Sequence, residues 1–151
     1  MPSIYGKFRA SSVMDFERNI NKLASDVEKQ AMREAVRKAS TPMLQDTRAK
    51  APVRTGALKE SLAVKVKTYK RGNNATVMAI IGPDSKFVGA NGDTPAKYAH
   101  LVEFGTEHSA AHPFLRPAFD ATKDESQRVY AASLKPAIQR IAARVNKRRP
   151  I

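Results

Sequence analysis

The sequence predicts an α+β fold with a long N-terminal helix, an antiparallel β-hairpin-based sheet, a short middle helix and a C-terminal helix. Apolar residues recur every three or four positions near both ends of the 151-residue chain, which is the period of a helix. Between these regions, apolar and polar residues alternate in two short runs, which is the period of a strand. The length suits one domain over residues 1–151, with flexible termini at about 1–10 and 147–151.

The long N-terminal helix is expected to begin just after Ser12 and to extend to about Lys50. A single apolar stripe runs along it, made of Phe16, Ile20, Leu23, Val27, Ala31, Ala35 and Ala39. Pro42 should kink or interrupt this helix, because proline lacks the backbone donor and crowds the preceding turn. We therefore expect two helical pieces on either side of Pro42.

A loop and then a hairpin should follow this helix. Pro52 disfavours helix at Ala51, and Gly56 accepts a positive φ, so residues 51–56 are expected to leave the helix as a loop. Strands are predicted at residues 62–69 and 75–82, joined by the turn signal of residues 71–74. In the first strand, one face is apolar and the other is cationic.

The remaining elements are predicted from prolines, glycines and apolar spacing. Residues 83–94 are expected to form a long loop, which at this length is functional or mobile. The predicted elements after it are a helix at Ala96–Phe104 opened by Pro95 and ended by Gly105, a loop at 107–112, an extended or turning segment at Pro113–Phe119, and a last helix at Phe119–Asn146 that Pro136 bends.

The chain is strongly basic, with 27 Lys and Arg against 14 Asp and Glu and a net charge of +13. Such a charge favours anionic partners, although a solvated basic surface without a ligand is the alternative. Sequence-specific DNA reading is not expected, since there is no helix-turn-helix spacing, zinc motif or aromatic stacking ladder. Candidate contacts with DNA in a channel, or with an acidic partner, are Lys65, Lys67, Lys70, Arg71, Arg140 and Arg144.

Other features of the composition exclude several classes of protein. The chain has no cysteine, which excludes disulfides and thiolate metal sites. It also lacks any run approaching the roughly 20 apolar residues that a membrane-spanning helix requires. We therefore expect no contact with a membrane.

No catalytic or metal-binding pattern is recognisable. His108 and His112 are candidate metal ligands by residue type and by their spacing of four. Such a pair must lie on one face of a helix, and Pro113 and the predicted loop disfavour a helix there. Ser109 and Asp120 would supply the partners of a histidine triad only by residue type, because their spacing matches no known arrangement. We expect no enzymatic activity, no metal and no cofactor.

Glu103 is the acidic residue that the pattern singles out, because it ends a short apolar helix. It could meet a cation across an interface, or it could pair within the chain with Arg116 or Arg54. We favour the internal pair, which would fix two turns against each other.

Three segments rich in proline, glycine and aromatic residues follow one another in a set order. They are Ala51-Pro52-x-x-Thr55-Gly56-x-Leu58-x-x-Ser61, then Tyr98-Ala99-x-x-Val102-Glu103-x-Gly105-Thr106, then Pro113-Phe114-Leu115-Arg116-Pro117-Ala118. In order and spacing, the chain resembles the neck and tail-completion family of long-tailed bacteriophages, also described as head–tail connector or minor tail proteins. The resemblance covers about residues 10–145.

The resemblance implies a structural virion protein rather than an enzyme. Such a protein would form a homo-oligomeric ring at the head–tail neck, six-fold in preference to twelve-fold, that completes the tail and joins it to the DNA-filled head. Its partners would be head-closure or connector proteins and the tail tube or tail terminator, with DNA passing transiently and without specificity. It would reside in the virion neck or tail, and in the host cytoplasm during assembly. The alternatives are a basic nucleic-acid-binding module and a tail-terminator ring.

Overall fold

The computed structural model describes residues 10–71 and 74–147. In chain order, its elements are α1 (Ala10–Ala39), α2 (Thr41–Lys50), α3 (Ala57–Ser61), β1 (Leu62–Arg71), β2 (Asn74–Pro83), α4 (Pro95–Phe104) and α5 (Leu115–Lys147). The predicted α+β class is therefore confirmed, including the long first helix, the antiparallel hairpin, the short middle helix and the C-terminal helix. The termini that the sequence predicts to be flexible lie largely outside the described residues.

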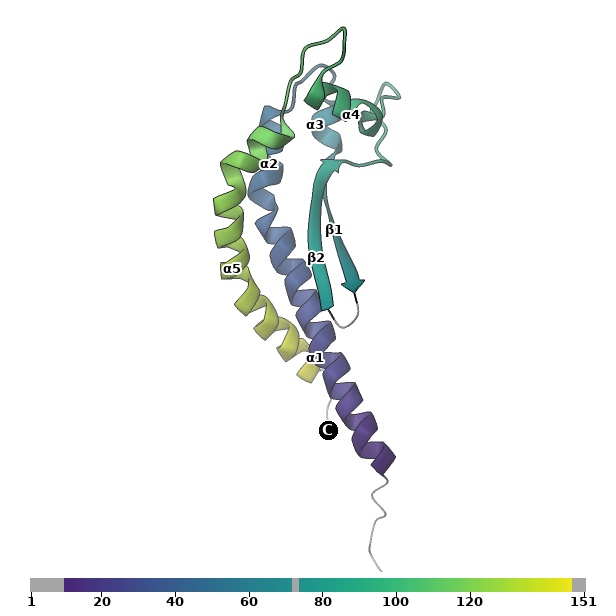
Figure 1. The fold of residues 1–151 in the computed structure, drawn as a ribbon, viewed down its shortest axis with the longest axis vertical. Coiled ribbons are helices and arrows are strands. Elements are labelled where there is room, and N and C mark those ends of the chain that lie inside the picture. Colours follow the sequence, from purple (N-terminus) through teal and green to yellow (C-terminus); the bar gives the residue numbers. More distant parts are fainter. Residues whose placement is uncertain (1–9, 72–73, 148–151) are drawn as a thin grey trace, which may run out of the picture.

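The molecule is elongated and has two distinct regions (Figure 1). In the first, which we call the shaft, α1 runs lengthwise while α5 and the hairpin of β1 and β2 pack against it. In the second, which we call the tip, α3 and α4 gather with their loops beyond the end of the hairpin. The tip comprises residues 51–62 and 84–114.

Pro42 interrupts the first long helix, as predicted. α1 ends at Ala39, and α2 begins at Thr41 with Pro42 in its first turn, where the missing amide costs no intrahelical hydrogen bond. At the junction, the hydroxyl of Ser40 donates to the carbonyl of Val36 over 2.7 Å. The chain therefore changes helix with little loss of backbone pairing.

The hairpin packs one face on α1 and leaves the other face open. β1 and β2 pair antiparallel, with Val64 opposite Ile81 and Val66 opposite Ala79 on the half-buried inner face. Arg33 of α1 donates to the Thr68 hydroxyl over 2.9 Å, which ties this face to the helix. The outer face presents Lys65, Lys67 and Tyr69 from β1 together with Thr76, Met78 and Ile80 from β2, all exposed.

The core of the shaft consists mainly of small residues. Ala31 of α1 and Ala137 of α5 are fully buried, and Ile141 is almost fully buried beside them. Alanine lets two helix backbones approach closely, because its side chain adds little width. Arg140 and Glu34 form an ion pair that also joins α5 to α1.

Two parts of the sequence prediction are wrong. Residues 57–61 form the one-turn helix α3, which is too short to show a period. The last helix begins at Leu115, so the prediction of an extended or turning segment holds only for residues 113–114 and fails for residues 115–119. Pro117 is tolerated there because it lies in the first turn of α5, where backbone amides have no acceptor within the helix.

Candidate functional site

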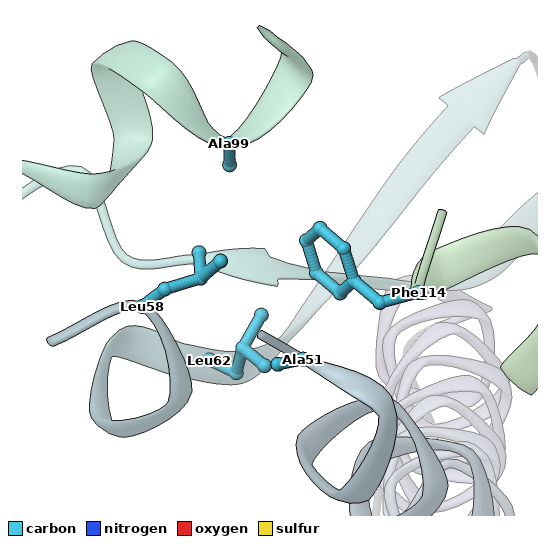
Figure 2. Close-up of a cluster of buried hydrophobic side chains, with 5 residues drawn as sticks. All are labelled: Ala51, Leu58, Leu62, Ala99 and Phe114. Atoms are coloured by element: carbon cyan, nitrogen blue, oxygen red, sulfur yellow. The ribbon is translucent and has the colours of Figure 1, made fainter. Parts of the chain in front are cut away.

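A compact apolar cluster holds the tip together. Its buried members are Ala51, Leu58, Leu62, Ala99 and Phe114. Figure 2 shows the Phe114 ring and the Leu58 and Leu62 side chains filling the space between Ala51 and Ala99. Phe114, which directly precedes α5, is fully buried. The cluster therefore joins the segments around α3, α4 and the start of α5 into one unit.

The carboxylate of Glu103 caps the start of α5. Its Oε2 accepts the backbone amides of Phe114 over 2.8 Å and Leu115 over 2.9 Å, while its Oε1 accepts that of Arg116 over 3.1 Å. The first amides of a helix have no acceptor within the helix, and their partial positive charge favours an anion. A buried residue at the end of α4 therefore fixes the start of α5.

The environment of Glu103 favours its charged form. Burial raises the pKa of this carboxyl, but the three backbone amides and the positive charge of Arg116 outweigh that effect, so its pKa lies below the ordinary value of 4.5. A hydrogen bond to a carboxylate stabilises the ionised form over the protonated one. The surroundings of Glu103 in the tip therefore stabilise its ionised carboxylate.

The prediction of an ion pair between Glu103 and the guanidinium of Arg116 or Arg54 is wrong, although Glu103 does act within the chain. The carboxylate binds the backbone of residues 114–116 instead of a cationic side chain. The Arg116 guanidinium lies over the Phe104 ring, 4.9 Å from its centroid, a distance typical of a cation–π contact.

Gly105 is required where α4 ends. Its φ is +76°, a region that other residues rarely adopt. A Cβ at this position would lie 2.8 Å from the Ala111 nitrogen and 2.9 Å from the Ser109 oxygen. The loop then folds back on α4, and the amide of His112 donates to the Val102 carbonyl over 2.8 Å. Gly105 therefore permits both the turn and the close approach of the returning chain.

The first two motifs meet around an open hollow of about 790 Å³ at the tip. The motif residues that line it are Pro52, Thr55, Gly56, Leu58, Tyr98, Val102 and Thr106. Glu103, Gly105, Phe114 and Leu115 do not line it, and they act instead in the packing and hydrogen bonds that hold its walls. Pro113 and Pro117 lie on either side of the start of α5.

The polar groups of the hollow come partly from the loop before α4. The Thr55 hydroxyl donates to Asp93 Oδ2 over 3.3 Å, and Arg54 and Asn91 lie on the same wall. Burial raises the pKa of Tyr98, and the carboxylate of Asp93 raises it further. The sequence did not indicate Asp93 or Asn91, because no local pattern shows that this loop returns to Thr55.

The chemistry of the hollow suits contact with another protein. Within residues 10–71 and 74–147, no group of three His, Asp or Glu side chains could hold a metal ion. Large apolar side chains are exposed at the tip: Val53 is 71% exposed, Phe104 62% and Leu101 43%. Leu101 lines the hollow, whereas Val53 and Phe104 lie elsewhere on the tip. Exposed apolar residues that gather in one region are typical of protein-binding surfaces.

The basic candidates do not form one surface. Lys65 pairs with Asp84 over 2.8 Å on the hairpin, and Arg140 pairs with Glu34 between α5 and α1. Lys67 and Arg144 are exposed on β1 and α5 respectively. The side chains of Lys70 and Arg71 lie outside the described residues. Two of the six candidates are therefore engaged within the chain.

Residues 14–105 match the family model HK97-gp10-like, described as "Bacteriophage HK97-gp10, putative tail-component". The matched range contains most of α1 and all of α2, α3, the hairpin and α4, and it ends before α5. No match was found to a curated protein or to a solved structure. In the part of the chain that the structure describes, no helix has the length and apolar character needed to cross a bilayer.

Proposed function

The chain belongs to the HK97-gp10-like family of phage tail components, and from this premise we propose that it forms a ring at the head–tail neck. Membership makes it a structural protein of the virion that contacts other virion proteins. The proposal adds a position and a role, in which the ring completes the tail and joins it to the DNA-filled head. A six-fold ring is preferred, because tail tubes are six-fold.

The proposal rests on the family match together with the hollow at the tip. The family's range ends close to the end of α4, and residues of the first two motifs line one hollow together with the exposed Leu101. We propose that the tip binds the axial neighbour, which is a head-closure or connector protein on one side or a tail tube or terminator protein on the other. The sides of the shaft would then face neighbouring copies in the ring.

The internal ion pairs count against the alternative of a nucleic-acid-binding module. Lys65 and Arg140, two of the cations that would bind phosphate, already pair with carboxylates. DNA passing through the ring would meet the remaining basic surface without specificity.

Deletion of the gene from the phage, followed by electron microscopy of the lysate, tests the proposal. Full heads beside separate, complete tails are expected, and the wild-type gene supplied in trans should restore joined virions. Abnormally long tails would identify a tail terminator instead. Joined, infectious particles without the protein would overturn any role in the neck.

A tip variant tests the surface assigned to the axial neighbour. Val53→Glu places a charge on a side chain that is 71% exposed, so folding should persist while joined virions become rare. Gln139→Glu introduces the same charge on an exposed position of α5 and serves as the matched control. Normal joining by Val53→Glu would exclude the tip as that surface.

A further inference from the structure

The free edge of β2 carries backbone groups that no other element pairs. One step beyond the first pair of the hairpin register, the Asp84 amide donates to the Ser61 carbonyl over 2.8 Å. Hydrogen-bonded and non-hydrogen-bonded pairs alternate along an antiparallel ladder. The backbone groups that point away from β1 are therefore those of Val77, Ala79 and Ile81. In the part of the chain that the structure describes, they form no backbone hydrogen bond with another element.

The opposite edge of the hairpin, along β1, is contacted by arginine side chains. Arg48 of α2 donates to the Leu62 carbonyl over 2.7 Å, and by the same alternation that carbonyl points away from β2. Arg33 of α1 donates to the Thr68 hydroxyl near the other end of the strand. Charged side chains placed at an edge strand hinder its pairing with a further strand. Of the two edges of the hairpin, that of β2 is therefore the open one.

A hollow of about 430 Å³ lies on the β2 side of the hairpin. Its walls are the inner face of β2, the junction of α1 and α2, and the first half of α5, and β1 contributes nothing to it. The apolar residues that line it are Val36, Met43, Ala79, Ile81, Phe119 and Tyr130. Successive side chains of a strand point to opposite faces of a sheet. A strand added to the edge of β2 would therefore direct every second side chain into this hollow.

Ser126 adds an unpaired polar group to the hollow. Buried hydroxyls elsewhere in the helices donate to the carbonyl four residues earlier, as those of Ser40 and Thr122 do over 2.7 Å. The hydroxyl oxygen of Ser126 is buried and has no hydrogen-bond partner among the described residues. The other polar side chains of α5 in the lining, Lys123 and Gln127, are exposed. A buried hydroxyl without a partner is costly, so an occupant with a polar group at this point would remove that cost.

We propose that β2 binds an extended segment of another virion protein as a third strand. The open edge of β2 requires an extended backbone, and the lining of the hollow requires apolar side chains at alternate positions of the segment. A helix in the hollow would leave the edge groups of β2 unpaired. A segment about 17 Å long would cover β2 from Val77 to Ile81.

The occupant is assigned to another protein because of the asymmetry between the two edges. The strand that a second copy would offer is β1, whose edge is contacted by Arg33 and Arg48 of its own chain. The chain belongs to a family of phage tail components, so other virion proteins are its partners. The inference therefore rests on membership of this family and does not depend on the proposed ring.

Photochemical cross-linking in assembled phage tests the occupant. The photoreactive amino acid p-benzoylphenylalanine is placed at Phe119, which lines the hollow and is 52% exposed. It should link to one segment of another virion protein, which mass spectrometry should show to have apolar residues at alternate positions. The same group at Tyr69, 49% exposed on the outer face of the hairpin, is the matched control and should not link to that segment. Links from position 119 only to further copies of this chain, or to no protein, would overturn the proposal.

A proline on each edge distinguishes strand addition from a simple apolar contact. Ala79→Pro removes an amide that points away from β1, and edge strands accept proline at such positions, so the chain should still fold. Loss of this donor should lower the yield of the cross-link from position 119 by about tenfold or more. Val66→Pro makes the same change on the β1 edge, directly opposite in the register, and should leave the cross-link unchanged. An undiminished cross-link in folded Ala79→Pro would overturn strand addition.

Hydrogen exchange gives a readout that requires no variant. The amides of Val77, Ala79 and Ile81 gain a partner when a strand is added, so a peptide covering residues 76–82 should exchange more slowly in virions than in the isolated chain. Equal exchange in the two would overturn the proposal.

These tests separate the inference from the proposed function. A ring of this protein at the neck, with neither the cross-link nor the slower exchange, would exclude strand addition and leave the proposed function standing. The cross-link and the slower exchange in virions that carry no such ring would support strand addition and overturn the proposed function.

Discussion

The tip and the shaft are stabilised by different kinds of contact. In the tip, one large ring, that of Phe114, is fully buried, and one carboxylate, that of Glu103, holds three backbone amides. In the shaft, the buried positions between α1 and α5 are mostly alanines such as Ala31 and Ala137. The stability of the tip therefore depends on individual side chains, whereas that of the shaft depends on how closely two backbones approach.

The largest effect is expected from Phe114→Ala. Removing a fully buried aromatic ring costs about 3–5 kcal/mol in the free energy of unfolding, which is a large part of the total for a domain of this size. Denaturant unfolding followed by circular dichroism measures the loss. Phe119→Ala is the matched control, because this ring is 52% exposed and its removal should cost much less. Equal losses for the two variants would contradict the division between tip and shaft.

The next effect is expected from Glu103→Gln. The amide side chain keeps one acceptor oxygen but removes the charge, so stability at neutral pH should fall by about 1.5–3 kcal/mol, the usual value of a hydrogen bond to a charged group. Glu107→Gln, at an exposed position, is the control and should leave stability nearly unchanged.

The pH dependence of the Glu103→Gln variant is more specific than its stability at one pH. The pKa of Glu103 is lower in the folded chain than the ordinary value of 4.5, so the unfolded chain takes up this proton first as the pH falls. Its contribution is therefore complete above that ordinary value and is lost as the pH falls through the folded-state pKa. The difference between wild type and Glu103→Gln should shrink in acid. A constant difference in the free energy of unfolding between the two proteins from pH 7 to pH 3 would show that the charge of Glu103 does not cause the loss of stability.

The smallest of the three effects is expected in the shaft. Ala35→Leu places a larger side chain at a fully buried position of α1, and overpacking of this kind costs about 1–3 kcal/mol. Ala131→Leu makes the same change at an exposed position of α5 and should be nearly neutral. A stabilising Ala35→Leu would show that the helices are not closely packed there.

Much of the fold could be predicted from the sequence, because each element has its own local signal. Period, proline and glycine placed α1, the interruption at Pro42, the hairpin and α4 close to their observed positions. The start of α5 was predicted too late because prolines 113 and 117 favour extended chain. The Glu103 carboxylate accepts the amides of residues 114–116 and so favours a helix start at this point. No local pattern in the sequence shows which amides a distant carboxylate will bind.

The candidate site was predicted only in part, for the same reason. The sequence indicates an internal role for Glu103 but suggests a cationic side chain as its partner, whereas the structure shows the backbone amides of residues 114–116 in that place. The sequence shows which side chains are charged and how they are spaced. It cannot show which backbone amides a side chain will bind, because every residue except proline has the same amide. The return of Asp93 to Thr55 was likewise set by the tertiary fold.

The cap on α5 also determines which substitutions the chain tolerates at the start of this helix. Glu103 lies inside the range matched by the family, whereas the three amides that it holds lie beyond it. Any residue except proline supplies such an amide. Residues 115 and 116 can therefore vary without loss of this cap, whereas the packing of α5 on α1 through Ala31, Ala137 and Ile141 restricts which helix can follow.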